Sequence, residues 1–331
     1  MFKNAKTLLI AMITIISLIV IVAIGVKTEL IILDPKGPVG IIQKDLIMYS
    51  IYFMLAIVIV VFVLFTFMVI KYRDRKNLSS KDYKPDMHGS TMLEIIWTII
   101  PILIVTALSI PNAKALYELK EPPKSSADKE PIVIYATAAD WKWIFSYPKE
   151  NIETVNYVNV PEDHPILFKV TAADSMASFW VPQIGGQIYG MPGMVNDLYL
   201  QADEPGKYEG RNSNFTGEGM THQQFNFVVL KEEDYQDWVK ETQENAPKLV
   251  EKTYEKLMLP ETVDEMTFSS THLEFVDHGK DPEYAMKIRE KYGVEIKGMK
   301  VKTDGNDEND SEEIDSKSEE ASSNSGSHSN H

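Results

Sequence analysis

Two long apolar runs constrain the fold of this chain more than any other feature. Leu46–Ile70 holds 25 residues without a charge, and a second run extends from about Met92 to Ala113 with only Glu94 near its start. At about 1.5 Å per residue, each run is long enough to cross a hydrocarbon core of roughly 30 Å. The sequence therefore predicts a transmembrane helical hairpin over residues 46–113.

The charges between the two runs predict the orientation of this hairpin. In the stretch KYRDRKNLSSKDYK of the connecting loop (residues 71–91), basic residues outnumber Asp74 and Asp82, and they are Lys71, Arg73, Arg75, Lys76, Lys81 and Lys84. Loops rich in Lys and Arg remain in the cytoplasm. We therefore expect a multi-pass protein of a bacterial plasma membrane, with everything after the second span on the outer face.

A further apolar stretch precedes the hairpin. Lys3 and Lys6 stand before the uncharged run Thr7–Val26, so residues 1–26 are either a signal peptide or an N-terminal transmembrane helix. The sequence leaves both alternatives open. Residues 27–45 would then form a linker on the outer side.

Composition excludes several classes of function. The chain has no cysteine, which removes disulfides, zinc–thiolate sites, iron–sulfur clusters and thiolate-bound copper. The net charge is −15, and residues 303–331 supply nine acidic residues against one lysine. This acidity argues against nucleic acid as a partner. We expect the tail itself to be disordered, because it has little apolar surface to bury.

The pattern changes after a linker predicted over residues 114–130. Short β-rich runs bounded by turn residues follow, as in PIVIYATAADWKWIFSYP and HPILFKVTAAD, and they predict a β-sandwich or barrel over residues 131–231. Residues 232–302 carry weak helical patterns that predict a helical C-terminal extension.

Several motifs in this order resemble subunit II of the haem–copper respiratory oxidases, the cytochrome c oxidase subunit II family. They are MLEIIWTIIPILIVTALSIP, DWKWIFSYP and ADSMASFWVPQIGG. LDPKGPV and FSSTHLEFVDHG are most similar to its quinol-oxidising branch, the aa-type menaquinol oxidases of Gram-positive bacteria. The resemblance implies two transmembrane helices followed by an outer cupredoxin-like β-sandwich.

The resemblance also implies that a copper site has been lost. Family members that oxidise cytochrome c hold two copper ions between two Cys, two His, one Met and a backbone carbonyl. Matching this sequence to that motif places Ala177 and Met220 at the histidines, Asn212 and Thr216 at the cysteines, Asn214 at the carbonyl position and Gln223 at the methionine. These residues cannot supply a soft ligand set. We therefore expect no metal and no cofactor in this chain, with haem and copper in the partner subunit I.

Three further residues have roles that only the resemblance suggests. Glu94 matches the cytoplasmic mouth of a proton channel into subunit I, although a carboxylate there can also simply reach interfacial water. Trp141 and Trp143 lie two apart on an expected strand, so both would face one side. They are predicted to pack against subunit I or within the sandwich core.

The seven histidines of the chain show no metal-ligand spacing. His272 and His278 are six residues apart, and a hydrogen-bonded structural pair is favoured over a site. The resulting hypothesis is a subunit II of a quinol oxidase that couples quinol oxidation to oxygen reduction and proton pumping, with no docking of cytochrome c. The alternative is a membrane-tethered binding or assembly protein that uses the same fold.

Overall fold

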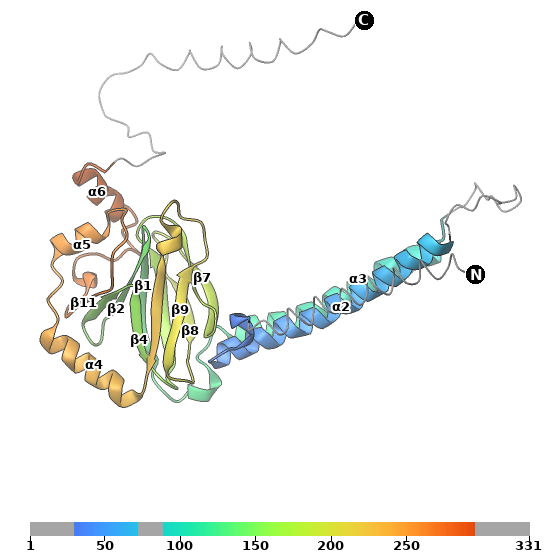
Figure 1. Cartoon of the computed structure of the whole chain (residues 1–331), viewed down its shortest axis with the longest axis horizontal. Helices are drawn as coiled ribbons and strands as arrows, with labels where there is room; N and C mark the ends of the chain where they lie inside the picture. Colours follow the sequence, from blue (N-terminus) through green and yellow to red (C-terminus); the bar gives the residue numbers. More distant parts are fainter. Residues whose placement is uncertain (1–29, 72–88, 295–331) are drawn as a thin grey trace, which may run out of the picture. The chain divides into compact units, whose positions relative to one another are not determined.

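The computed structural model describes residues 30–71 and 89–294. The first apolar stretch, most of the predicted cytoplasmic loop and the acidic tail lie outside the described residues. Within the described part, long apolar helices come first and a β-sandwich with attached helices follows (Figure 1).

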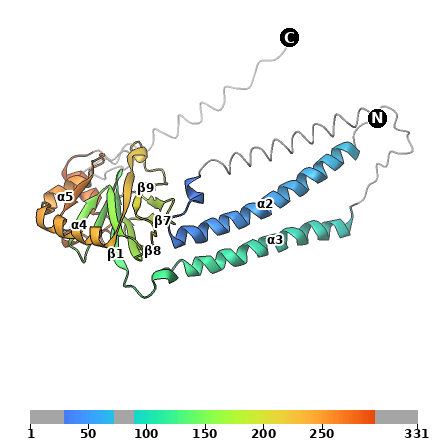
Figure 2. The same cartoon turned by 60° about the horizontal axis from the view of Figure 1, so that its bottom comes forward.

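Two antiparallel helices form the predicted hairpin (Figure 2). Helix α2 spans Pro38–Lys71 and helix α3 spans Thr91–Glu118, and both are long and apolar enough to cross a membrane. The Tyr49 hydroxyl of α2 donates to the Ala107 carbonyl of α3 at 3.4 Å. Helix α3 continues through two prolines, at positions 101 and 111.

The predicted ends of these helices need correction. Helix α2 begins at Pro38, inside the segment predicted as a linker over residues 27–45, and α3 continues past Ala113 into the linker predicted over 114–130. Helical hydrogen bonding does not stop where a run of apolar residues stops. Proline also suits the first turn of a helix, where its missing N–H would have no partner.

The outer domain is a sandwich of two sheets. One sheet has the strand order β11-β3-β2-β1-β5-β8 and the other has the order β4-β10-β9-β6-β7. The strands are β1 Ile132–Ala139, β2 Lys142–Tyr147, β3 Ile152–Val155, β4 Tyr157–Pro161, β5 Ile166–Ala172, β6 Ala177–Val181, β7 Gly185–Gly190, β8 Asn196–Leu200, β9 Gly206–Asn212, β10 Gln224–Leu230 and β11 Met266–Phe268. The predicted β-sandwich is thereby confirmed.

Aromatic side chains fill the space between the sheets. Trp143 is fully buried, and its ring lies 5.3 Å from that of Phe179 and 5.8 Å from that of Phe225. Phe145 and Phe168 continue the same cluster. Because each buried aromatic ring removes a large apolar area from water, this cluster is a main source of the domain's stability.

The C-terminal extension packs around the sandwich (Figure 1). Its helices are α4 Glu232–Asn245, α5 Glu251–Leu257 and α6 Tyr284–Lys291. Strand β11 interrupts the region that was predicted to be helical and pairs antiparallel with β3. This three-residue strand is too short for a period-2 signal in the sequence, and it forms because β3 offers a free edge.

The beginning of α2 is fastened to the sandwich next to β7. The Lys36 amide donates to the Gln183 carbonyl at 2.7 Å, and the Gly186 amide donates to Gln43 Oε1 at 3.2 Å. Gly185 has φ +104°, and a Cβ there would lie 2.7 Å from the Gly40 nitrogen. Glycine is therefore required at position 185, both for its backbone conformation and for the close approach.

Candidate functional site

The loop between β9 and β10 gathers most of the predicted copper-ligand positions. Strand β9 ends at Asn212, the short 3-10 helix η3 covers Met220–His222, and β10 begins one residue after Gln223. Because β9 and β10 are antiparallel neighbours, the two ends of the loop face each other. The backbone N–H of Asn212 donates to the backbone carbonyl of Gln223 at 2.9 Å.

Asn212, Thr216 and Gln223 form a closed hydrogen-bond network, which we call the amide triad. Asn212 Nδ2 donates to Thr216 Oγ1 at 3.0 Å and to Gln223 Oε1 at 2.8 Å. Thr216 Oγ1 donates to Gln223 Oε1 at 3.0 Å. Asn212 and Gln223 are 4% and 2% exposed, so these bonds lie out of contact with bulk water.

Backbone groups determine how the two amides are oriented. Asn212 Oδ1 accepts from the amides of Ser178 at 2.8 Å and Asn214 at 2.9 Å. Two donors can only face an oxygen, so Nδ2 must point toward Thr216 and Gln223. Gln223 Nε2 in turn donates to the Lys142 carbonyl at 3.4 Å. Every polar atom of the two amide groups therefore has a partner within the chain.

Trp141 covers this loop from the other sheet. Its indole Nε1 donates to the Thr216 carbonyl at 3.0 Å, and a Cβ at Gly219 would lie 2.1 Å from the indole ring. Gly219 therefore allows the backbone to lie directly against the ring. Trp141 is half-buried and is the residue that joins the β1–β2 turn to the loop.

The prediction that Trp141 and Trp143 face the same side is wrong. Trp141 has φ +65° and lies in the turn between β1 and β2, so the alternation of a strand does not apply to it. Trp143 is within β2 and its side chain is fully buried in the sandwich core. Of the two alternatives for Trp143, the structure supports the core, and its side chain has no surface to offer a partner.

Comparison with known proteins identifies the family. The models for the transmembrane and periplasmic domains of cytochrome c oxidase subunit II match residues 26–114 and 148–231. Quinol oxidase subunit 2 of Bacillus subtilis is 55% identical over 304 residues, which is 92% of this chain and 94% of that protein. The chain belongs to the cytochrome c oxidase subunit II family.

A second relative agrees with this membership, and one solved structure is reported beside it. Probable quinol oxidase subunit 2 of Staphylococcus saprophyticus is 45% identical over 274 residues, covering 82% of this chain and 72% of that protein. The periplasmic domain of subunit II of cytochrome oxidase (CoxB) of Bradyrhizobium japonicum is 25% identical, covers 34% of this chain and 93% of that domain, and has a TM-score of 0.33. The Bacillus subtilis relative is named quinol oxidase subunit 2, and the Staphylococcus saprophyticus relative is named probable quinol oxidase subunit 2.

The donor set at the positions predicted to match the family's copper ligands does not fit copper. Soft thiolate and imidazole ligands suit a copper ion that exchanges electrons, whereas the amide triad offers neutral amide and hydroxyl groups. Its polar atoms already form hydrogen bonds to one another and to backbone groups. The residues of the described ranges, 30–71 and 89–294, also contain no cluster of three or more His, Cys, Asp or Glu that could hold a metal.

The other predicted positions take structural roles around the triad. Ala177 is the first residue of β6 and is 1% exposed, so it contributes only a methyl group. Asn214 Nδ2 donates to the Met176 carbonyl at 2.7 Å, which ties the loop to the segment before β6. Met220 is half-buried in η3.

His272 and His278 are buried in the C-terminal extension but do not bond to each other. His272 Nδ1 lies 2.7 Å from Glu153 Oε2, and the Tyr254 hydroxyl lies 2.6 Å from His278 Nε2. Burial, together with the nearby His272, lowers the pKa of His278 to about 3, and burial raises the pKa of Tyr254 well above its usual value. The Tyr254 hydroxyl and the imidazole therefore form a hydrogen bond between two neutral groups, which is a structural arrangement.

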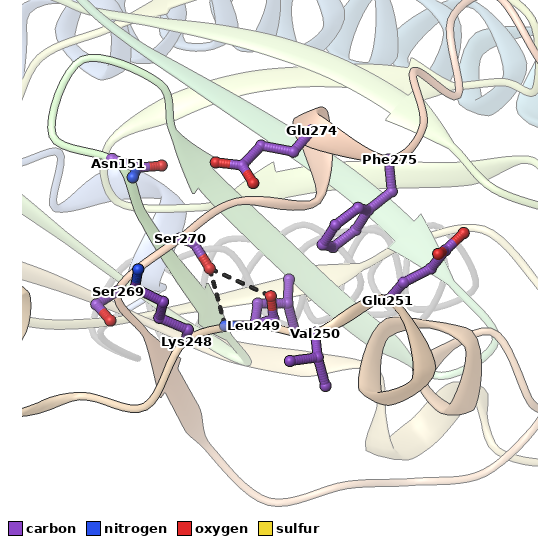
Figure 3. A pocket seen from close by; sticks show the side chains of 9 residues that line it. All are labelled: Asn151, Lys248, Leu249, Val250, Glu251, Ser269, Ser270, Glu274 and Phe275. Carbon is purple, nitrogen blue, oxygen red and sulfur yellow. Dashed lines mark hydrogen bonds between the residues drawn. The ribbon is translucent and has the colours of Figure 1, made fainter.

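An open pocket of about 310 Å³ lies between the extension and the β2–β3 turn (Figure 3). Its lining residues are Asn151, Lys248, Leu249, Val250, Glu251, Ser269, Ser270, Glu274 and Phe275. The Ser270 hydroxyl is already paired with the backbone of Leu249, at 2.8 Å to the nitrogen and 3.3 Å to the oxygen. Acidic and basic side chains are mixed around it, so the pocket favours no particular ligand class.

Sequence reasoning missed the partners that complete the site. The Ser178 amide and the Lys142 carbonyl are backbone groups, and no residue pattern distinguishes them. The turn at Trp141 was missed because the DWKW stretch reads as a continuous strand. Only the spacing of Asn212, Thr216 and Gln223 could have indicated the network, since it places three hydrogen-bonding side chains at the predicted copper-ligand positions.

Proposed function

We propose that this chain is the non-redox second subunit of a respiratory quinol oxidase. The amide triad carries this proposal, because a loop whose ligand positions bond to one another has no means of accepting electrons from a soluble donor. Electrons would pass from a membrane quinol to haem and copper in subunit I without crossing the outer domain. The names of the full-length relatives support a quinol as the donor.

The proposed division of labour places the redox chemistry in the partner subunit. Neither α2 nor α3 contains a histidine, the residue that most often ligates haem between helices. The hairpin would pack against subunit I in the membrane, and the sandwich would cover its outer surface. We propose menaquinol as the quinol and the bacterial plasma membrane as the location, with the outer domain on the non-cytoplasmic side.

Exposed apolar residues on the loop support a contact with another subunit. Phe215 is 80% exposed and Met176 is 44% exposed, and Asn214 links the two segments that carry them. The half-buried Trp141 bonds to the same loop through the Thr216 carbonyl. Surfaces of this kind mark protein contacts more often than they remain in water.

Glu94 is proposed as a proton-collecting carboxylate. It lies in the first turn of α3, and its backbone carbonyl accepts from the Thr98 hydroxyl at 2.8 Å. A carboxylate at the beginning of a membrane span is well placed to gather protons from the cytoplasm.

The deciding experiment is a mild detergent purification through a tag on this chain, followed by a visible spectrum, copper analysis of the chain after separation, and oxygen-uptake assays. Co-purified haem with uptake driven by menaquinol but not by reduced cytochrome c would support the proposal. Copper in the separated chain together with uptake driven by cytochrome c would overturn it. A colourless preparation without uptake, from cells whose oxidase remains active, would favour the binding or assembly protein instead.

A further inference from the structure

Four buried charged side chains meet where the C-terminal extension contacts the β1–β2 turn. Arg289 of α6 forms ion pairs through Nη2 with Asp140, at 3.0 Å, and with Asp174. The side chains of Asp140, Asp174 and Arg289 are 16%, 5% and 7% exposed, and Lys142 is fully buried. We call this set the charge clamp, and its two acids balance its two bases.

The two bases of the clamp bind three consecutive carbonyls at the end of α5. Lys142 Nζ donates to Leu257 O at 3.0 Å and to Leu259 O at 2.8 Å, and Arg289 Nε donates to Met258 O at 2.9 Å. The last carbonyls of a helix have no partner within the helix, and they attract cations. The clamp therefore joins α5 and α6 to the residues on both sides of Trp141.

The third bond of Lys142 returns to the turn itself. Its Nζ donates to the Asp140 carbonyl at 3.0 Å, so all three ammonium protons have acceptors. Burial lowers the pKa of Lys142 to about 8, and the nearby Asp174 and Asp140 oppose that shift. Burying a lysine side chain this deeply costs free energy. Its hydrogen bonds are therefore expected to stabilise a contact that the fold requires.

Trp141 stands between two members of the clamp in an unfavourable backbone conformation. A bulky residue at φ +65° is an outlier, and it persists only where its surroundings fix it in place. The clamp supplies this restraint from one side. On the other side, Trp141 bonds to Thr216 and lies against Gly219, while the Lys142 carbonyl accepts from Gln223 of the amide triad.

We propose that the C-terminal extension, through the charge clamp and Trp141, holds the loop of residues 212–223 in a single conformation. The loop is thus ordered by the chain's own extension, where metal ligation would otherwise provide the cross-links. The chain of contacts is continuous from Arg289 and Lys142 through the Trp141 turn to Thr216 and Gln223. This inference concerns the ordering of the loop and stands independently of the proposed electron donor.

Hydrogen exchange of the purified full-length protein in its complex, read by mass spectrometry, tests the proposal. Arg289→Met removes the ion pairs and the bond to Met258, and it is expected to speed exchange of the loop amides by at least about tenfold. Lys291→Met is the matched control. Lys291 is also on α6, but its ion pair with Glu255 is 58% exposed on the lysine side, and exchange in the loop should not change.

Two milder variants separate loop ordering from folding of the extension. Arg289→Lys keeps the charge, so the protein should fold even where Arg289→Met does not, and a smaller increase in loop exchange is expected. Trp141→Phe removes the indole N–H and one of the two fused rings, and it should speed exchange in the loop while leaving α5 and α6 unchanged. Faster exchange confined to α5 and α6 in the Arg289 variants, with the loop as protected as before, would overturn the proposal, as would no change in any segment.

Discussion

Replacing Asn212 with alanine tests whether the amide triad stabilises the loop. The substitution deletes two donated and two accepted hydrogen bonds of a side chain that is 4% exposed. The amides of Ser178 and Asn214 then lose their acceptor, and Gln223 Oε1 loses one of its donors. An unsatisfied buried polar group costs about 1–3 kcal/mol, so the loop should lose roughly 3–5 kcal/mol of local stability.

This loss is measurable at individual backbone amides. At about 1.4 kcal/mol per tenfold, the lower figure corresponds to roughly hundredfold faster hydrogen exchange at Ser178 and Asn214. Asn196→Ala is the matched control, because it removes a single exposed bond from Asn196 Nδ2 to the Tyr189 carbonyl within the same domain. Exchange at Ser178 and Asn214 that equals that of the control would refute the view that the triad holds the loop.

Three further predictions concern charged groups. Burial and the nearby Asp174 raise the pKa of Asp140 from 3.8 to about 6, against the effect of Arg289, so the stabilising contribution of its proton is complete below pH 3.8 and is lost as the pH rises through about 6. Asp140→Asn should therefore destabilise the protein less at about pH 7.5 than at about pH 4, and an equal change in thermal midpoint at both values would contradict this. Glu94→Gln should slow oxygen reduction several-fold while the complex still assembles, and unchanged turnover in a quinol-driven uptake assay would leave only an interfacial role for this carboxylate. Removal of residues 303–331 should leave activity and assembly intact because the segment is almost entirely polar, and failure to co-purify subunit I would show that reasoning to be wrong.

The membrane hairpin and the sandwich could be predicted because their signals extend over many residues. An uncharged run as long as Leu46–Ile70 has few possible structures other than a membrane-spanning helix. Short β-rich stretches with turns at regular intervals are typical of sandwiches. The ends of the helices were less accurate, since Pro38 opens α2 well before the apolar run begins. The length of an apolar run reflects the thickness of the membrane, whereas the helix continues as far as its backbone hydrogen bonds do.

The site could be predicted only in part, because the family motif indicates which residues belong to it but not how their side chains are arranged in space. The positions of Asn212, Thr216 and Gln223 follow from the family motif, yet their mutual bonding depends on the close approach of β9 and β10. The charge clamp was not predicted at all. Asp140 and Arg289 are 149 positions apart (289 − 140), and nothing in the local sequence of either residue indicates the other.

The hydrogen bonds of the amide triad also limit which substitutions the loop can accept. A single return to a metal ligand, such as cysteine at position 212, would remove the acceptor for the Ser178 and Asn214 amides while providing only one of several ligands. The loop would then lose the stability of the present network before it gained the binding energy of a metal. A metal-bearing form of this loop would therefore require several substitutions together. The amide triad is therefore better understood as an alternative way of folding this loop than as the remnant of an empty site.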